Sequence, residues 1–224
     1  MRLADVSTYV IHSRRLVDRW ERLSVALSSQ GIRAQWVSDP DATELTRATR
    51  RKYYRGNRRL WRKRASATRP IPFRRLTASE IAATISHIEA YSRLIASGKE
   101  WALILEDDAV FEEDFSSRFD AYFASIPDDA DLVFLGGILR LQLVNADPNQ
   151  HFFRKDHPAT NCVDSYVVGS SAARAILETI VPFALPIDWE LNYQLKLHDL
   201  RVYWIEPPLV TQGSEVGIHQ SSIR

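Results

Sequence analysis

The chain has 224 residues, of which 45% are hydrophobic and 25% charged; these are ordinary values for a globular protein with one full hydrophobic core. Its single cysteine, Cys162, excludes a disulfide within the chain and argues against a cysteine-based zinc site. No apolar run approaches the ~20 residues needed to cross a bilayer, and residues 1–5 lack a charged, then apolar, signal pattern, so we expect one domain in a reducing, cytoplasmic compartment.

The first elements are indicated by hydrophobic periodicity. Residues 7–12 are rich in β-branched and aromatic side chains, which is typical of a buried strand. Apolar residues spaced three to four apart then predict a helix over residues 15–30, with Gly31 as its stop. Residues 33–38 predict a second strand.

Residues 47–75 form a strongly basic segment. They contain 13 Lys and Arg and no Asp or Glu, whereas the rest of the chain holds 16 basic against 28 acidic residues. Such a segment beside an acidic body predicts an anionic partner: nucleic acid, the inner leaflet of a membrane, or a phosphorylated glycolipid. The alternative is a flexible, solvated loop. The cations that we expect at an acceptor or membrane surface are Arg51, Lys52, Arg58, Arg59, Arg62 and Lys63.

The second half of the chain alternates between strands and helices. Thr77 or Ser79 can cap a helix that runs to Ser97 and is closed by Gly98. Near-continuous apolar strands separated by helices predict an α/β sheet covered on both faces. The strands are expected at residues 101–105, 131–135, 166–168 and 202–205, and the helices at 171–180 and 189–198.

Three acidic residues follow the clearest strand. Glu106, Asp107 and Asp108 come directly after the apolar residues 101–105, at the end of a strand where ligands bind in α/β sheets. Adjacent carboxylates repel one another unless a cation lies among them, and Mg²⁺ or Mn²⁺ binds through one or two carboxylates plus substrate phosphates. Alternation along an extended chain places Glu106 and Asp108 on one side and Asp107 on the other. An acidic turn exposed to water is the alternative.

One face of the helix at 77–97 carries further polar residues. Glu80, Thr84 and His87 are spaced i, i+4 and i+7, and Ser86 lies beside them. This face can support the acidic turn or hold a donor sugar, or it can be a buried, hydrogen-bonded helix face.

These segments, taken in order, resemble glycosyltransferase family 25, the bacterial lipopolysaccharide and lipooligosaccharide sugar transferases and the collagen galactosyltransferases. The similar segments span nearly the whole chain; they are Val10-Ile11-His12-Ser13-Arg14-Arg15-Leu16-Val17-Asp18-Arg19, Glu80-Ile81-Ala82-Ala83-Thr84-Ile85-Ser86-His87, Leu103-Ile104-Leu105-Glu106-Asp107-Asp108-Ala109, Pro186-Ile187-Asp188, and Pro207-Pro208-Leu209-Val210-Thr211-Gln212 with Gln220-Ser221-Ser222-Ile223. The chain departs from the family where His12 and Ser13 replace Asn and Leu, and where Ala82-Ala83 replaces Gly-Cys. These are packing or nucleotide-contact positions, so the resemblance does not extend to the contacts with the base of the donor, whereas the acidic motif is intact.

The resemblance implies a GT-A type fold, Rossmann-like, with a mixed sheet flanked by helices. It also implies a nucleotide-sugar donor, commonly UDP-galactose, a metal-dependent reaction with Mn²⁺ or Mg²⁺, and a glycolipid or oligosaccharide acceptor. We expect Glu106 and Asp108 to bind the metal, with His219 as a third ligand or as a surface residue. The residues expected near the nucleotide-sugar are His12, Arg15, Asp107, Glu80, Ser86 and His87.

The family includes inverting enzymes, in which a base takes the proton of the acceptor hydroxyl. We expect Asp188 in this role, with the N-cap of a helix as its structural alternative and Asp164 as the alternative base. Arg15 and Arg19 can pair with phosphate or with the acidic body, and neighbouring acids favour ordinary surface pairing for Arg19.

Two other functions compete with this prediction. A nucleic-acid-binding protein would use residues 47–75, but no recognition motif accompanies the basic segment, so nucleic acid is not the expected partner. A GT-A-fold nucleotidyltransferase would need the same metal and a glycine-rich phosphate loop after the first strand, where residues 12–15 contain no glycine. In the glycosyltransferase reading, the basic segment holds the enzyme near a phosphorylated, membrane-embedded acceptor on the inner face of the membrane.

Overall fold

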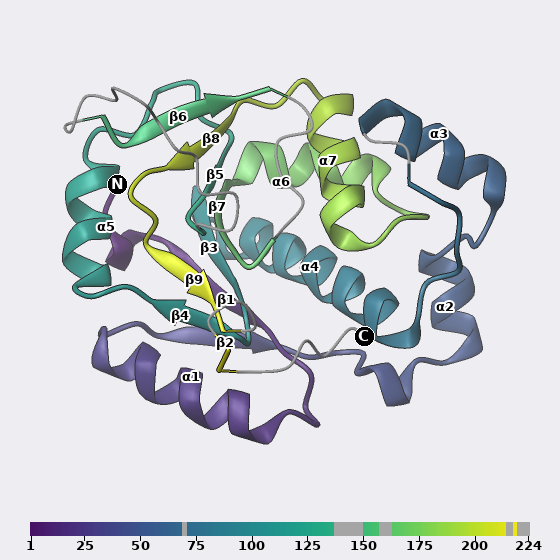
Figure 1. Ribbon diagram of the computed structural model, residues 1–224, viewed down its shortest axis with the longest axis horizontal. Helices are drawn as coiled ribbons and strands as arrows, with labels where there is room; N and C mark the ends of the chain where they lie inside the picture. The colour runs from purple at the N-terminus through teal and green to yellow at the C-terminus, as the bar shows by residue number, and fades with distance from the viewer. Residues whose placement is uncertain (69–70, 137–149, 157–162, 214–216, 219–224) are drawn as a thin grey trace.

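The computed structural model describes residues 1–68, 71–136, 150–156, 163–213 and 217–218. They form a mixed seven-stranded sheet with helices on both faces, together with a separate two-stranded ribbon (Figure 1). This confirms the predicted mixed α/β architecture. The order in the large sheet is β2-β1-β3-β7-β5-β8-β6, made of β1 (Ser7–Ile11), β2 (Ala34–Val37), β3 (Trp101–Glu106), β5 (Leu132–Phe134), β6 (Phe152–Lys155), β7 (Ser165–Gly169) and β8 (Val202–Ile205).

The strand directions bring two loops to one edge of the sheet. β1 runs parallel to β2 and to β3, whereas β7 lies antiparallel between β3 and β5. The last residues of β1 and β3 are register partners, Ile11 opposite Glu106. The segments that follow Ile11 and Glu106 therefore start side by side.

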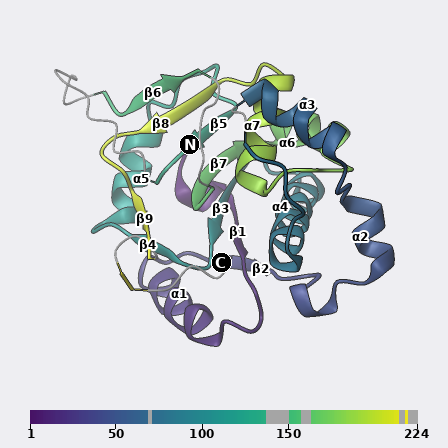
Figure 2. The ribbon, with the colours of Figure 1, turned by 45° about the vertical axis from the view of Figure 1, so that its right-hand side comes forward.

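Alternating side chains of the central strands supply two hydrophobic layers. Tyr9, Ile104 and Tyr166 face one side, which is covered by α4 (Ala78–Ser97), α6 (Ser170–Thr179) and α7 (Ile187–Leu197). Val10 and Leu103 face the other side. That side is covered by α1 (Val17–Ser29) and α5 (Phe115–Phe123), which Figure 2 shows across the sheet from α4. The ribbon pairs β4 (Ala109–Phe111) with β9 (Val210–Gln212) in antiparallel fashion just beyond the acidic turn.

The predicted boundaries of α4 are confirmed by its caps. Thr77 is the N-cap, and it forms a reciprocal capping box with Glu80. Gly98 ends the helix with φ of +68°, a left-handed conformation that glycine adopts without steric cost. Local signals thus fix both ends of the helix that lies beside the site.

The basic segment is folded rather than loose. It contains α2 (Arg47–Tyr53) and α3 (Arg58–Thr68), which follow the 3-10 turn η2 (Ala42–Glu44). Trp61 and Ala65 are buried, and α3 packs beside α7 at the right of Figure 1. The flexible-loop alternative is therefore wrong for the described part of this segment. A second 3-10 turn, η1 (Leu3–Asp5), precedes β1.

Among the described ranges, no helix is both long enough and apolar enough to cross a membrane.

Candidate active site

A pocket opens where β1 and β3 end, beside the first turns of α4. Its walls come from the loops after β1 and β2, from α4, and from the acidic turn after β3. It is lined by Ile11, His12, Ser13, Arg15, Arg19, Pro40, Asp41, Ala42, Ser79, Ala82, Ala83, Ser86, Glu106, Asp107, Asp108 and Gln212. Of the residues predicted from the sequence, the structure brings His12, Arg15, Ser86 and the three acids together.

Within the acidic turn, Asp107 is neutralised by the protein itself. Its Oδ2 atom lies 3.0 Å from His12 Nδ1 and accepts a hydrogen bond from the Ser13 backbone N–H at 3.3 Å. Its Oδ1 atom accepts a hydrogen bond of 2.7 Å from Arg19. Burial alone would raise the pKa of Asp107, but the hydrogen bonds and the charge of Arg19 hold that pKa below its ordinary value. Asp107 is thus an ionised, fixed group.

The expected surface pairing of Arg19 is wrong. Arg19 is only 7% exposed, and its Nη1 atom lies 2.7 Å from Asp107 and 3.7 Å from Asp108. It shares the buried face of α1 with Leu23 and Leu27, at intervals of four residues. That face turns the guanidinium toward the end of β3, a partner that local charge spacing does not reveal.

Glu106 and Asp108 are not neutralised to the same extent. Burial raises the pKa of Glu106 well above its ordinary value, and the nearby charges of Asp108, Asp188 and Asp164 raise it further. Burial likewise raises the pKa of Asp108, although Arg19 opposes this effect. Asp108 Oδ1 is buried and has no hydrogen-bond partner among the described residues. The described part of the chain therefore does not supply enough positive charge to stabilise both carboxylates in their ionised forms.

The polar residues of α4 lie in different environments. Ser86 lines the pocket, whereas Glu80 and His87 do not. Glu80 is buried in an ion pair with Arg74 and closes the capping box with Thr77, which accounts for both of its oxygens. Thr84 donates a hydrogen bond to the Glu80 backbone carbonyl. Most of this face is thus a hydrogen-bonded helix face, which was the alternative interpretation.

His87 lies behind the pocket wall. It is fully buried, with Nδ1 2.8 Å from the Tyr166 hydroxyl and Nε2 3.8 Å from Glu106 Oε1. Burial lowers the pKa of His87 to about 3, so its imidazole is neutral at physiological pH.

Two further carboxylates, those of Asp164 and Asp188, raise the pKa of Glu106 by their charge, although they do not line the pocket. Burial, together with the charges of Asp164 and Glu80, raises the pKa of Asp188 to about 7. The structural alternative for Asp188 is wrong, because the N-cap of α7 is Pro186 and Asp188 is the second residue of the helix. Asp164 is buried and accepts a hydrogen bond of 2.9 Å from the Ser165 hydroxyl.

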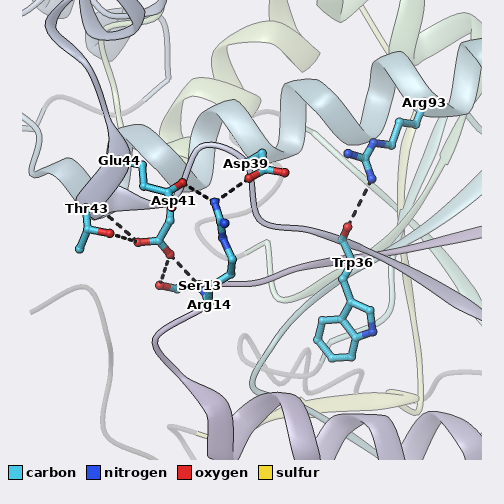
Figure 3. Close-up of polar contacts among 8 residues, drawn as sticks. All are labelled: Ser13, Arg14, Trp36, Asp39, Asp41, Thr43, Glu44 and Arg93. Atoms are coloured by element: carbon cyan, nitrogen blue, oxygen red, sulfur yellow. Dashed lines mark hydrogen bonds and ion pairs between the residues drawn. The ribbon is translucent and has the colours of Figure 1, made fainter.

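The loop after β1 is fastened to the segment after β2, as Figure 3 shows. Asp41 accepts hydrogen bonds from the Ser13 hydroxyl at 2.9 Å, the Arg14 backbone N–H at 3.1 Å, and the backbone and hydroxyl of Thr43 at 3.1 and 3.0 Å. The Arg14 side chain pairs with Asp39 at 2.6 Å and also with Glu44. These contacts fix the pocket wall that carries His12 to Arg15.

The family model described as glycosyltransferase family 25 (LPS biosynthesis protein) matches residues 6–190. The chain belongs to glycosyltransferase family 25. A search of curated proteins finds no match. Among solved structures, the crystal structure of A197 from STIV is similar, with a TM-score of 0.39 and 15% identity over 91% of this chain and 81% of that chain.

In this family 25 chain, the match includes the acidic turn, Ser86-His87 and Asp188, and it places the protein among the glycosyltransferases of lipopolysaccharide biosynthesis. The match ends before Gln212 and before His219, and His219 lies outside the described residues, as does Cys162. Among the residues that the structure describes, no group of three or more His, Cys, Asp or Glu side chains is arranged to hold a metal ion.

Sequence reasoning missed Asp41 and Gly136 of this family 25 chain. Asp41 precedes Thr43 in a pattern typical of a capping turn, a local signal that could have been used. Gly136 lies two residues after the end of β5, and a methyl group there would overlap the Asp164 carboxylate, with Oδ1 only 2.7 Å from the added carbon. The glycine therefore makes room for an acid that lies 28 residues away in the sequence.

The cations predicted at an acceptor or membrane surface all lie on the outer side of α2 and α3. Their side chains are exposed, and none of them forms an ion pair with the described part of the chain. The six residues are Arg51, Lys52, Arg58, Arg59, Arg62 and Lys63. Arg64 of the same segment is instead buried in an ion pair with Glu190 of α7.

Proposed function

We propose that this family 25 protein transfers galactose from UDP-galactose to a hydroxyl of a lipopolysaccharide or lipooligosaccharide acceptor, with inversion, using Mn²⁺ or Mg²⁺ on a GT-A type fold. The observation that carries the proposal is the pair Glu106 and Asp108, two carboxylates with raised pKa values in one pocket. Such a pair is stable in its ionised form when positive charge is supplied from outside the chain.

The chemistry of this pair fits a hard divalent cation. Asp108 Oδ1 is buried without a hydrogen-bond partner in the described part, and Glu106 faces the pocket with its charge unneutralised. Glu106 and Asp108 would hold the ion, in keeping with the preference of Mg²⁺ for one or two carboxylates plus phosphate oxygens. When bound, the ion supplies positive charge that stabilises the departing diphosphate.

The opposite wall of the pocket suits an anionic donor. The exposed Arg15 lines the pocket, and its guanidinium donates a hydrogen bond of 3.1 Å to the Ser79 hydroxyl on the first turn of α4. The first turn of a helix carries partial positive charge, which favours a phosphate group nearby. His12 and Ser86 lie on the same walls and are proposed contacts of the nucleoside or sugar.

Asp188 is the proposed base, with Asp164 as the alternative. A carboxylate with a pKa of about 7 is well matched to accept a proton near neutral pH. In the proposed step, Asp188 takes the proton of the acceptor hydroxyl while the oxygen of that hydroxyl attacks the anomeric carbon. The bond from that carbon to the diphosphate breaks at the same time, and the configuration inverts.

The proposal is tested by donor hydrolysis and UDP binding, with and without Mn²⁺, across a set of nucleotide-sugars. We expect Mn²⁺-dependent binding of UDP, and a loss of turnover of about 100-fold or more in Asp108→Asn. Glu113→Gln is the matched control, because Glu113 is an exposed acid five residues further along the chain. Equal activity of the Asp108→Asn and Glu113→Gln enzymes, or UDP binding that ignores the metal, would refute the assignment.

We also propose that the exposed cations of α2 and α3 hold the enzyme at an anionic membrane surface. α2 starts five residues after the pocket-lining Ala42, so the cationic face and the pocket are joined by a short stretch of chain. Each cation near an anionic bilayer contributes about 1 kcal/mol, weakened by salt. Six such residues would suffice for reversible attachment close to a lipid-linked acceptor.

Co-sedimentation with vesicles tests this attachment. We expect binding to phosphatidylglycerol-containing vesicles at low salt, and no binding to phosphatidylcholine vesicles. Replacing four cations of α3 with glutamine should release the protein, whereas replacing four exposed cations elsewhere should not. The test variant changes Arg58, Arg59, Arg62 and Lys63, and the control changes Arg22, Arg33, Lys99 and Arg154. Equal release by both variants would show that net charge, rather than the surface of α3, causes the binding to anionic vesicles, which would contradict the proposal.

A further inference from the structure

A buried row of three side chains lies behind Glu106. The Tyr91 hydroxyl is 2.7 Å from the Tyr166 hydroxyl, which is 2.8 Å from His87 Nδ1. The other ring nitrogen, His87 Nε2, faces Glu106 Oε1 at 3.8 Å and has no hydrogen-bond partner in the described part of the chain. All three side chains of the row are fully buried. The row thus leads from the core to a carboxylate of the pocket.

The row has a preferred direction. If Tyr91 donates to Tyr166 and Tyr166 donates to His87 Nδ1, every hydroxyl proton has an acceptor and the imidazole proton lies on Nε2. In the reverse direction the proton of Tyr91 has no acceptor among the described residues, and a bare Nε2 lone pair faces the carboxylate. Buried polar groups without partners are costly, so the first direction is favoured. It points an N–H group at Glu106.

We propose that His87 is a positioning residue for Glu106, with Nε2–H donating to the ionised carboxylate and with the two tyrosine hydroxyls fixing the tautomer. This proposal rests on the proposed function, because it takes Glu106 as a ligand of the divalent ion. The present separation of 3.8 Å exceeds a hydrogen bond, and contacts of this kind tighten when substrate or ion is bound. Groups that orient a metal-binding side chain contribute to ion affinity even though they never touch the ion.

The chain offers a matched control for the tyrosines. Tyr9 of β1 and Tyr166 of β7 are both register partners of Ile104, one on each side of β3, and both side chains are fully buried in the same layer. The Tyr9 hydroxyl, unlike that of Tyr166, has no hydrogen-bond partner in the described part. Tyr9→Phe and Tyr166→Phe therefore remove the same atom from comparable sites, and only the second breaks the row.

The first experiment reads the tautomer without any reaction. Nitrogen-15 NMR of the histidine side chains, in EDTA, should show His87 protonated on Nε2. Tyr166→Phe should alter the tautomer ratio of His87, and Tyr9→Phe should leave it unchanged. A proton on Nδ1 in the unaltered protein would mean that the two tyrosine hydroxyls do not fix the tautomer of His87, which overturns the proposal. A response to Tyr9→Phe equal to that of Tyr166→Phe also overturns it.

The second experiment measures the affinity for Mn²⁺ in the presence of UDP by electron paramagnetic resonance. His87→Leu should weaken Mn²⁺ binding about 10- to 100-fold, whereas His87→Gln, which keeps an amide N–H donor, should stay within about threefold of the unaltered protein. Equal affinity of His87→Leu and the unaltered protein would overturn the positioning role. If the unaltered protein binds no Mn²⁺, the proposed function fails instead, and the NMR result still decides the tautomer.

Discussion

Replacement of Asp188 by asparagine should stabilise the protein at neutral and alkaline pH while it removes activity. The pKa of Asp188 is about 7 in the folded chain, against an ordinary value of 3.8. The folded state therefore binds this proton more tightly than the unfolded state does. The bound proton makes its full contribution to the free energy of unfolding below pH 3.8, and this contribution is lost progressively as the pH rises to 7. It amounts to at most ~4 kcal/mol at 1.36 kcal/mol per pKa unit.

Asparagine imitates the protonated carboxyl at every pH. The free energy of unfolding of Asp188→Asn should thus equal that of the unaltered protein near pH 4 and exceed it increasingly up to pH 8. Urea unfolding in EDTA at several pH values gives this difference directly. Asp18→Asn is the matched control, because Asp18 is an exposed acid and the second residue of α1, as Asp188 is of α7.

The control should lose only its favourable interaction with the helix dipole, about 0.3–1 kcal/mol, with no growth of the difference toward pH 8. Donor transfer by the unaltered enzyme should rise with pH through an apparent pKa near 7 as Asp188 ionises. A difference in unfolding free energy that is flat between pH 4 and 8 would refute the reasoning. Residual transfer in Asp188→Asn close to that of the unaltered enzyme would assign the base to Asp164 instead.

Three further predictions concern the supporting structure. Gly136→Ala places a methyl group against the Asp164 carboxylate, and thermal unfolding should show a loss of about 1–3 kcal/mol. Arg64→Met leaves the charge of Glu190 buried without its partner, so denaturant unfolding should show a loss of about 3–5 kcal/mol, most of which a second change, Glu190→Gln, should restore. Thr77→Ala removes the N-cap of α4 and should cost about 1 kcal/mol; no loss in the same assay would mean that the capping box is not a stabilising feature.

The elements that sequence analysis predicted best are those specified by local signals. The helix at 78–97 has a capping residue at one end and a glycine at the other, and the strand before the acidic turn is an unbroken apolar run. α5 was missed although Phe115, Phe119 and Phe123 recur every four residues, a usable signal for a helix face. β4 and β9 have three residues each and pair across about a hundred residues of sequence, so periodicity cannot detect them.

The sequence predicted which residues make up the candidate site, but not the hydrogen bonds and ion pairs among them. The acidic turn, His12, Arg15 and Ser86 were named from the sequence, and all of them line the pocket. The sequence could not show which of the acidic side chains are neutralised by a cationic side chain of the protein. The neutralisation of Asp107 by Arg19 depends on contacts between residues 88 positions apart, and such contacts follow from the packing of α1 on the sheet.

The ion pair between Arg64 and Glu190 has a consequence for how the basic segment can be studied. Glu190 also accepts hydrogen bonds from the backbone of Ala184 and Leu185, at 3.1 and 3.2 Å, just ahead of the helix that carries Asp188. Excising α2 and α3 would therefore strand a buried anion and loosen the neighbourhood of Asp188, and any lost activity would be misread as lost docking. The outer cations have to be removed by substitution of their side chains, with both helices and Arg64 left in place.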